Sequence, residues 1–179
     1  MTGNPPESLL VVASFSRHPE ALAWAEDQLQ LAFGPIQLRS PDYDFHHTRY
    51  YEPEMGTRLR KRLLVFARMP AADALADLKN RTIALERQLA ESGQFSEQRP
   101  LNLDPGLLQL GKFLLASTKD QTQRIYLRDG IFAEITLRFQ GGAFEPWPWT
   151  YADYREPEVL RFLSEARAQL YQRLRSSAS

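Results

Sequence analysis

Several residue types and patterns that define common functional classes are missing from this 179-residue sequence. It contains no cysteine, which excludes disulfide frameworks, thiolate nucleophiles and zinc sites built on sulfur. Its three histidines show neither the His-x-x-x-His nor the His-Glu-x-x-His spacing, so we expect no metal site. The phosphate-binding patterns Gly-x-x-x-x-Gly-Lys-Ser/Thr and Gly-x-Gly-x-x-Gly are also absent.

The chain also lacks an excess of charge and a long hydrophobic run. Lysine and arginine number 22, as do aspartate and glutamate, so nucleic acid is a possible but not a favoured partner. The apolar run Leu9–Ala13 is too short for a signal peptide, and no run approaches the roughly 20 residues that span a bilayer. We therefore expect a soluble, cytoplasmic protein with no membrane partner.

The chain length fits one domain, which we expect to have a core over residues 9–175 and flexible ends at residues 1–7 and 176–179. The apolar run Leu9–Phe15 predicts a central strand, and the stretch up to Gly34 has helical periodicity. Short apolar runs at Ile36–Leu38 and Leu63–Phe66 predict two further strands, and a helix follows from Pro70 to Gly93. This β-α-β-β-α order is ferredoxin-like.

In the second half, the segment Asn102–Gly106 is typical of a helix start, with Asp104 as the cap and Pro105 in the first turn. We expect a short buried helix over Leu107–Ala116. Turns at Asp129-Gly130 and Gly141-Gly142 predict an antiparallel meander, and Glu156–Arg175 predicts a terminal helix. The fold class is therefore α+β. The pattern leaves open whether the meander extends the first sheet or packs beside it.

Three motifs together resemble a known family. They are Tyr50–Gly56 (YYEPEMG), Asn102–Gly106 (NLDPG) and Pro148–Arg155 (PWTYADYR). With these motifs the chain is similar, from Leu9 to about Arg167, to the bacterial family labelled domain of unknown function 4416. The resemblance implies no established activity. Some relatives carry a GTP-binding label, although this chain has none of the usual phosphate-loop patterns.

Glu134 is the first candidate for a catalytic group. A two-residue turn at Asp129-Gly130 would place it opposite Ile125, on the strand face shared by Phe132 and Thr136. A carboxylate desolvated there would have a raised pKa and could exchange protons, whereas the alternative is an exposed ion pair with Arg138. The residues expected on the opposite face are Ile131, Ala133, Ile135, Leu137 and Phe139.

Glu52 is the second acidic candidate. With Glu54 two residues later, it could flank a cation or form an acid–base pair. The alternative is a turn that Tyr50 and Met55 hold against the core while both glutamates face water.

Five further residues form the candidate ligand- or anion-binding set. Lys119 and Arg124 precede the first meander strand and could hold a phosphate or carboxylate, unless they belong to a solvated loop. Asn102 and Asp104 stand at the expected helix start, where capping is the alternative role. Tyr51, in the Tyr50–Gly56 motif, completes the set.

The leading functional hypothesis is a small-molecule or nucleotide-binding domain, with or without enzymatic activity, that has a polar pocket between the meander and the Tyr50–Gly56 motif. One alternative is an RNA-binding or ribonucleoprotein-associated module that uses the basic run Arg58–Arg62 and the aromatic segment Trp147–Tyr154. Another is a structural homodimer or adaptor that associates through a sheet edge or that segment. The sequence identifies neither a cofactor nor a reaction.

Overall fold

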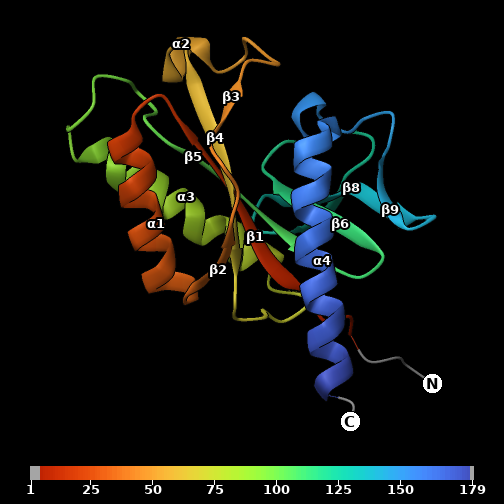
Figure 1. Ribbon diagram of the computed structural model, residues 1–179. Coiled ribbons are helices and arrows are strands. Elements are labelled where there is room, and N and C mark those ends of the chain that lie inside the picture. The colour runs from red at the N-terminus through yellow and green to blue at the C-terminus, as the bar shows by residue number, and fades with distance from the viewer. Residues whose placement is uncertain (1–4, 178–179) are drawn as a thin grey trace.

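A computed structural model of the protein describes residues 5–177, and its strands form one antiparallel sheet in the order β2-β4-β1-β5-β6-β8-β7 (Figure 1). The short strand β3 pairs with β4, and β9 pairs with β8. The elements are β1 (Leu9–Ser16), α1 (Pro19–Phe33), β2 (Ile36–Arg39), β3 (Tyr43–Phe45), α2 (Glu52–Met55), β4 (Leu59–Phe66), α3 (Leu75–Glu91), β5 (Asn102–Leu108), β6 (Lys112–Ser117), β7 (Ile125–Arg128), β8 (Ile131–Gln140), β9 (Ala143–Pro146), the 3₁₀ helix η1 (Ala152–Arg155) and α4 (Pro157–Ser177).

Helices cover both faces of the sheet. In Figure 1, α1 and α3 lie on one side of the central strands and α4 lies on the other. Leu10 and Val12 of β1 pack toward α1 and α3, whereas Val11 and Ala13 pack toward α4. Every residue of β1 is buried, because successive side chains of a central strand point to opposite covered faces.

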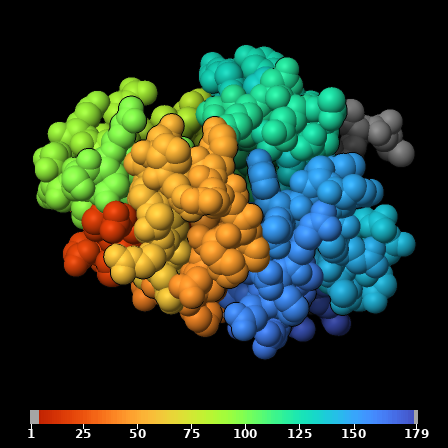
Figure 2. Space-filling view, turned by 90° about the horizontal axis from the view of Figure 1, so that it is seen from above, coloured from red at the N-terminus to blue at the C-terminus, as the bar shows by residue number. Residues whose placement is uncertain are grey.

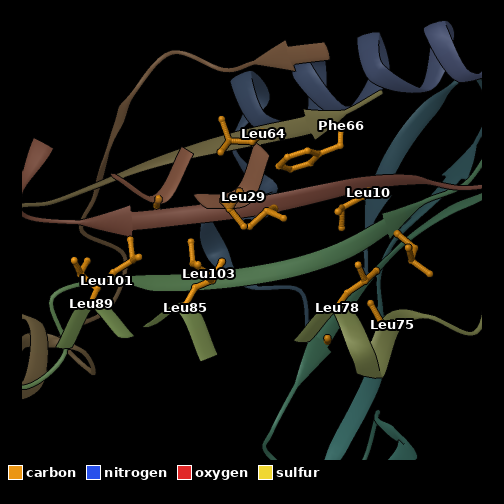
Figure 3. Packing of buried hydrophobic residues seen from close by; sticks show 14 of the residues in the cluster. Leu10, Leu29, Leu64, Phe66, Leu75, Leu78, Leu85, Leu89, Leu101 and Leu103 are labelled. Atoms are coloured by element: carbon orange, nitrogen blue, oxygen red, sulfur yellow. The ribbon is translucent and has the colours of Figure 1, made fainter. Parts of the chain in front are cut away.

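Leucines dominate the core on the α1/α3 face. Leu85 and Leu89 of α3 pack near Leu101 and Leu103 (Figure 3). Leu64 and Phe66 of β4 belong to the same cluster, on the same face of the sheet. The stripe on α3 predicted by spacings of three and four residues is therefore the face that packs on the sheet. A third, smaller cluster is formed by Phe15, Phe45, Met55 and Leu59 at the end of the molecule near α2.

The mixed α+β class, the antiparallel meander and the terminal helix are confirmed. The meander extends the first sheet, because β8 pairs with β6 as well as with β7 and β9. The terminal helix continues to Ser177, so Ser176 and Ser177 are helical and not part of a flexible end. The remaining terminal positions, residues 1–4 and 178–179, lie outside the described residues.

The predicted helix over residues 107–116 is wrong. Residues 102–108 form strand β5, which pairs with β1 along its whole length, and residues 112–117 form β6. The local Asp-Pro-Gly signal favours a helix start, but pairing with the buried strand β1 overrides it. Asp104 therefore caps no helix and instead lies opposite Ala13 in the sheet.

Strands β5 and β6 pair over only part of their length. β6 contacts β5 at Gly106–Leu108, but Ala116 and Ser117 pair with β8 alone. The stretch from Asn102 to Pro105 thus has a partner strand on one side only, which is where a sheet tolerates the missing N–H of proline. The sheet separates between β5 and β6 at this end.

The meander differs from the predicted hairpin register and from the predicted alternation of β8, through one extra residue in each case. An extra residue on β7, Leu127, brings Ile125 opposite Ala133 instead of Glu134. On β8, Leu137 pairs with Phe113 but Ile135 pairs with Leu114, so Thr136 is an extra residue. Ile131 and Ala133 consequently pack toward α1 and α3, whereas Leu137 and Phe139 pack toward α4.

Gly106 marks the last point of close contact between β5 and β6. A Cβ atom built on it would lie 2.4 Å from the Leu114 carbonyl oxygen and 2.8 Å from the Phe113 ring. We predict that Gly106→Ala lowers the free energy of unfolding by about 1–3 kcal/mol, measured by urea denaturation, because the strands would have to move apart. Gly111→Ala is the matched control, since a Cβ there meets nothing within 4 Å. Equal stability of the two variants would contradict this explanation.

Candidate functional site

A cavity of about 410 Å³ opens where β5 and β6 separate. Its wall is formed by β1, β4, β5, β6 and β8, by the connection between β3 and α2, by residues 117–124 and by residues 151–154. Viewed from above, the orange segment around α2, the green-blue segment after β6 and the blue segment before α4 border one another on this face (Figure 2). The cavity thus collects side chains from segments far apart in the sequence.

A buried ion pair lies deep in the cavity. Lys61 of β4 donates from Nζ to Asp153 Oδ2 at 2.6 Å, and both side chains are about 4% exposed. The Lys61 Nζ also lies 4.7–5.4 Å from the centroids of the Tyr154, Phe45 and Phe15 rings. Burial alone would lower the pKa of Lys61, but Asp153 and the surrounding groups outweigh it and raise this pKa well above its ordinary value. Lys61 is therefore a permanent cation that the aromatic faces and one carboxylate stabilise.

A second ion pair crosses the separation between the strands. Lys79 belongs to α3, yet its Nζ donates to the Leu103 carbonyl at 2.8 Å and to Asp104 Oδ1 at 2.9 Å. The amide of Asn102 donates to the other oxygen of Asp104 at 2.7 Å. Burial opposes ionisation of Asp104, but the charges of Lys79 and Lys61 and these hydrogen bonds hold its pKa below the usual range. Asp104 is thus ionised and fixed in place.

Arg124 and Glu134 form the third pair. Arg124 Nε donates to Glu134 Oε2 at 3.0 Å, and the two side chains are 1% and 2% exposed. The other guanidinium nitrogens donate to Ser117 Oγ at 2.8 Å, to the Lys119 carbonyl at 2.9 Å and to the Tyr151 hydroxyl at 2.7 Å. Four of the five N–H donors of Arg124 therefore have protein partners, and its main effect is to hold the wall of the cavity together.

Glu134 accepts further hydrogen bonds, from Gln123 Nε2 at 3.1 Å and from Thr136 Oγ1 at 3.4 Å. The ion pair with Arg138 that sequence alternation suggests does not form, because Arg138 pairs with Glu145 of β9 instead. A carboxylate held by these donors suits a positioning role better than proton transfer. The catalytic role of Glu134 stays a prediction.

The mouth of the cavity carries less constrained groups. The Lys119 Nζ lies 3.7 Å from the centroid of the exposed Tyr50 ring. Arg99 donates to Asn102 Oδ1 and lies 3.6 Å from a Glu54 oxygen and 3.7 Å from a Glu86 oxygen. Burial raises the pKa of Glu86 despite the nearby cations.

Two buried tyrosine hydroxyls close to Lys61 have no hydrogen-bond partner among the described residues, those of Tyr43 and Tyr154. Burial raises the pKa of Tyr43 to about 12, and it raises that of Tyr154 well above its ordinary value. Tyr154 also lines the cavity. Its hydroxyl is therefore a neutral, buried group without a hydrogen-bond partner among residues 5–177.

Six of the seven candidate residues predicted from the sequence line this cavity: Glu134, Lys119, Arg124, Asn102, Asp104 and Tyr51. Glu52 does not. It begins α2, accepts from Arg49 Nε at 3.2 Å and borders a separate surface hollow with Gly56 and Arg58. The structure thus offers Glu52 no shared site with Glu134.

Sequence reasoning missed Lys61, Lys79 and Asp153. Lys61 stands in the basic run Arg58–Arg62, which resembles a solvated edge, and only the alternation of β4 distinguishes it from its neighbours. Arg60 and Arg62 point to the other face, where Asp44, Asp42 and Glu26 neutralise them. Lys79 is one polar residue on an amphipathic helix, and the neighbouring sequence does not show that its side chain extends to Leu103 and Asp104 of β5.

Within residues 5–177, no group of three or more histidine, aspartate or glutamate side chains is arranged to hold a metal ion. His46 and His47 stack on each other with ring centroids 4.7 Å apart, and His18 pairs with Glu97. In the same part of the chain, no helix is both long enough and apolar enough to cross a membrane.

The fold and the cavity define a mixed α+β protein with an antiparallel sheet and a polar, aromatic-lined site at one end of it. The sequence profile of the family described as Domain of unknown function (DUF4416) matches residues 5–170, and the chain belongs to this family. No curated protein and no solved structure matches the chain significantly.

The Lys61–Asp153 pair tests how far the cavity depends on its buried charges. We predict that Lys61→Met lowers the free energy of unfolding by about 3–5 kcal/mol, because Asp153 would stay buried without a partner. Urea denaturation measures the change. The control is Arg49→Met, which breaks the exposed pair with Glu52 and should cost about 1 kcal/mol or less. A Lys61→Met/Asp153→Leu double variant should recover much of the loss, and equal effects of Lys61→Met and Arg49→Met would refute the prediction.

Proposed function

We propose that the cavity binds a small anionic molecule of the nucleotide class. One observation carries the proposal: the wall brings together six aromatic side chains and five cations, against three carboxylates. The aromatic residues are Phe15, Phe45, Tyr50, Tyr51, Tyr151 and Tyr154, and the cations are Lys61, Lys79, Arg99, Lys119 and Arg124. Aromatic faces suit a planar base, and the surplus of positive charge suits a phosphate.

The size of the site supports this proposal. Its volume of about 410 Å³ lies within the range of roughly 300–1,000 Å³ that small-molecule pockets occupy. Most of its polar groups are fixed by one another, so the site is largely formed before a ligand arrives. Such preorganisation favours binding, because little conformational freedom remains to be lost.

The same groups leave room for catalysis, which we keep as part of the proposal. Asp104 is an ionised carboxylate between two lysines. Burial raises the pKa of the Tyr51 hydroxyl, and the nearby charge of Asp104 raises it further. Of the two residues predicted from the sequence for acid–base roles, Glu134 lines this cavity, whereas Glu52 borders the separate hollow beside Gly56. We also propose a cytoplasmic location. A ferredoxin-like first half is a further proposal, and it is supported by the element order β1-α1-β2-β4-α3-β5 and by the strand arrangement β2-β4-β1-β5.

Two other functions have weaker support. The RNA-binding alternative needs a free basic surface, but Arg60 and Arg62 are neutralised by acidic neighbours. The homodimer alternative has one favourable feature, namely that β7 ends the sheet and exposes the side chains of Ile125 and Tyr126. Sedimentation velocity over a dilution series tests it, and a monomer at every concentration would count against it.

Ligand-dependent melting tests the proposed binding function. We expect one or more members of a panel of nucleosides, nucleotides and sugar phosphates to raise the Tm of the protein, by about 2–4 °C for each kcal/mol of stabilisation. Lys119→Glu should reduce the shift, because it reverses the charge at the mouth. Lys112→Glu makes the same change of charge on β6 outside the cavity and should leave the shift intact. A panel without effect on the wild type would remove the proposal.

A further inference from the structure

The charges of the cavity wall cancel in pairs at its deep end. Lys61 pairs with Asp153 and Arg124 with Glu134, and all four of these side chains are at most 4% exposed. Lys79 pairs with Asp104, whose side chain is 27% exposed. Each pair holds one cation and one carboxylate. An anionic group placed among them would meet as much repulsion as attraction, so the surplus of positive charge lies elsewhere.

Arg99 contributes little of that surplus. Its guanidinium donates to Asn102 and lies within 4 Å of carboxylate oxygens from both Glu54 and Glu86. These neighbours share its charge, and its face lies over the Tyr51 ring at 5.8 Å from the centroid. Arg99 therefore shapes the wall near Asn102 and offers no unshared charge to a ligand.

Lys119, unlike Arg99, shares its charge with no carboxylate among the described residues. It is exposed at the mouth, and it forms no salt bridge with any residue in the described span 5–177. Its Nζ rests over the Tyr50 ring at 3.7 Å, and the peptide carbonyl of the same residue accepts from Arg124. The backbone of Lys119 is thus anchored to the cavity wall while its ammonium group is held only by an aromatic face. A phosphate can bind this ammonium group without displacing a carboxylate.

The deep end is neutral and closely packed. The Tyr154 hydroxyl is buried and has no partner among the described residues, and Tyr154 is 2% exposed. Lys61, next to it, has one carboxylate acceptor for its three N–H donors. The hydroxyl itself is closed to a ligand, but the Tyr154 side chain lines the cavity and the charges beside it cancel, so this end suits an uncharged nucleoside.

Resting on the proposed nucleotide-binding function, we infer that the ligand is a nucleoside monophosphate, bound with its single phosphate at Lys119 in the mouth and its nucleoside directed toward Tyr154 at the deep end. A second or third phosphate meets no further unpaired cation among the described residues of the wall. The site therefore selects for the presence of one phosphate and gains little from a di- or triphosphate chain.

Isothermal titration calorimetry on the full-length protein tests this assignment. The probes are purine and pyrimidine nucleosides, their 5′-monophosphates and their 5′-triphosphates, all without divalent cations. For the base that binds best, we expect the monophosphate to bind about tenfold or more tightly than the nucleoside, as one charge-assisted contact provides. We expect the triphosphate to bind within about threefold of the monophosphate, since it finds no additional cation.

One variant and its control test the phosphate end of the site. Lys119→Gln should abolish the preference for the monophosphate over the nucleoside while leaving the nucleoside affinity unchanged. Lys112→Gln should alter neither affinity.

The possible outcomes distinguish the two proposals. If nucleotides bind but the triphosphate binds about tenfold more tightly than the monophosphate, or if Lys119→Gln keeps the monophosphate preference, the assignment to a monophosphate is wrong and the proposed function stands. If no nucleoside or nucleotide binds the wild type, the proposed function fails and the assignment fails with it.

Discussion

The cavity depends on the incomplete pairing of β5 with β6. Where two neighbouring strands separate, their facing backbone groups and the side chains between them need other partners. Pro105 removes one N–H from this stretch, and Gly106 allows the strands to meet closely just before they part. Lys79 then reaches from α3 to Leu103 and Asp104 through the opening. One local feature of the sheet thus connects the helical layer on one face to the polar site on the other.

The buried charges are costly to place there. Each of the three ion pairs loses hydration, and such pairs often stabilise a protein no more than apolar side chains of similar size would. Their value lies in geometry, because each pair joins two different elements: β4 with η1, α3 with β5, and the loop before β7 with β8. These contacts fix the position of Lys61, which lies among three aromatic rings at the deep end of the site.

Local patterns predicted most of the fold and part of the site. The apolar run of β1, the spacing on α3 and the Asp129-Gly130 turn each have one structural interpretation. Asp104-Pro105-Gly106 has two, and the choice of strand over helix comes from pairing with β1, which no local pattern contains. The extra residues Leu127 and Thr136 shift the register of β8, and no local pattern reveals these two irregularities either. The ion pair between Lys61 and Asp153, which are 92 residues apart, could not be predicted from the sequence. An ion pair between distant segments does not change the periodicity of either segment.

The position of α4 after all nine strands has a consequence for the order of assembly during synthesis. One face of the sheet, including Val11, Leu63 and Phe113, has this helix as its cover, and the segment that carries Asp153 immediately precedes it. A nascent chain that has emerged only as far as β9 therefore exposes an apolar surface and an unneutralised Lys61 together. Both are resolved by the same segment, residues 152–177, so this face of the core and the buried ion pair of the cavity form together, after the strands have been synthesised.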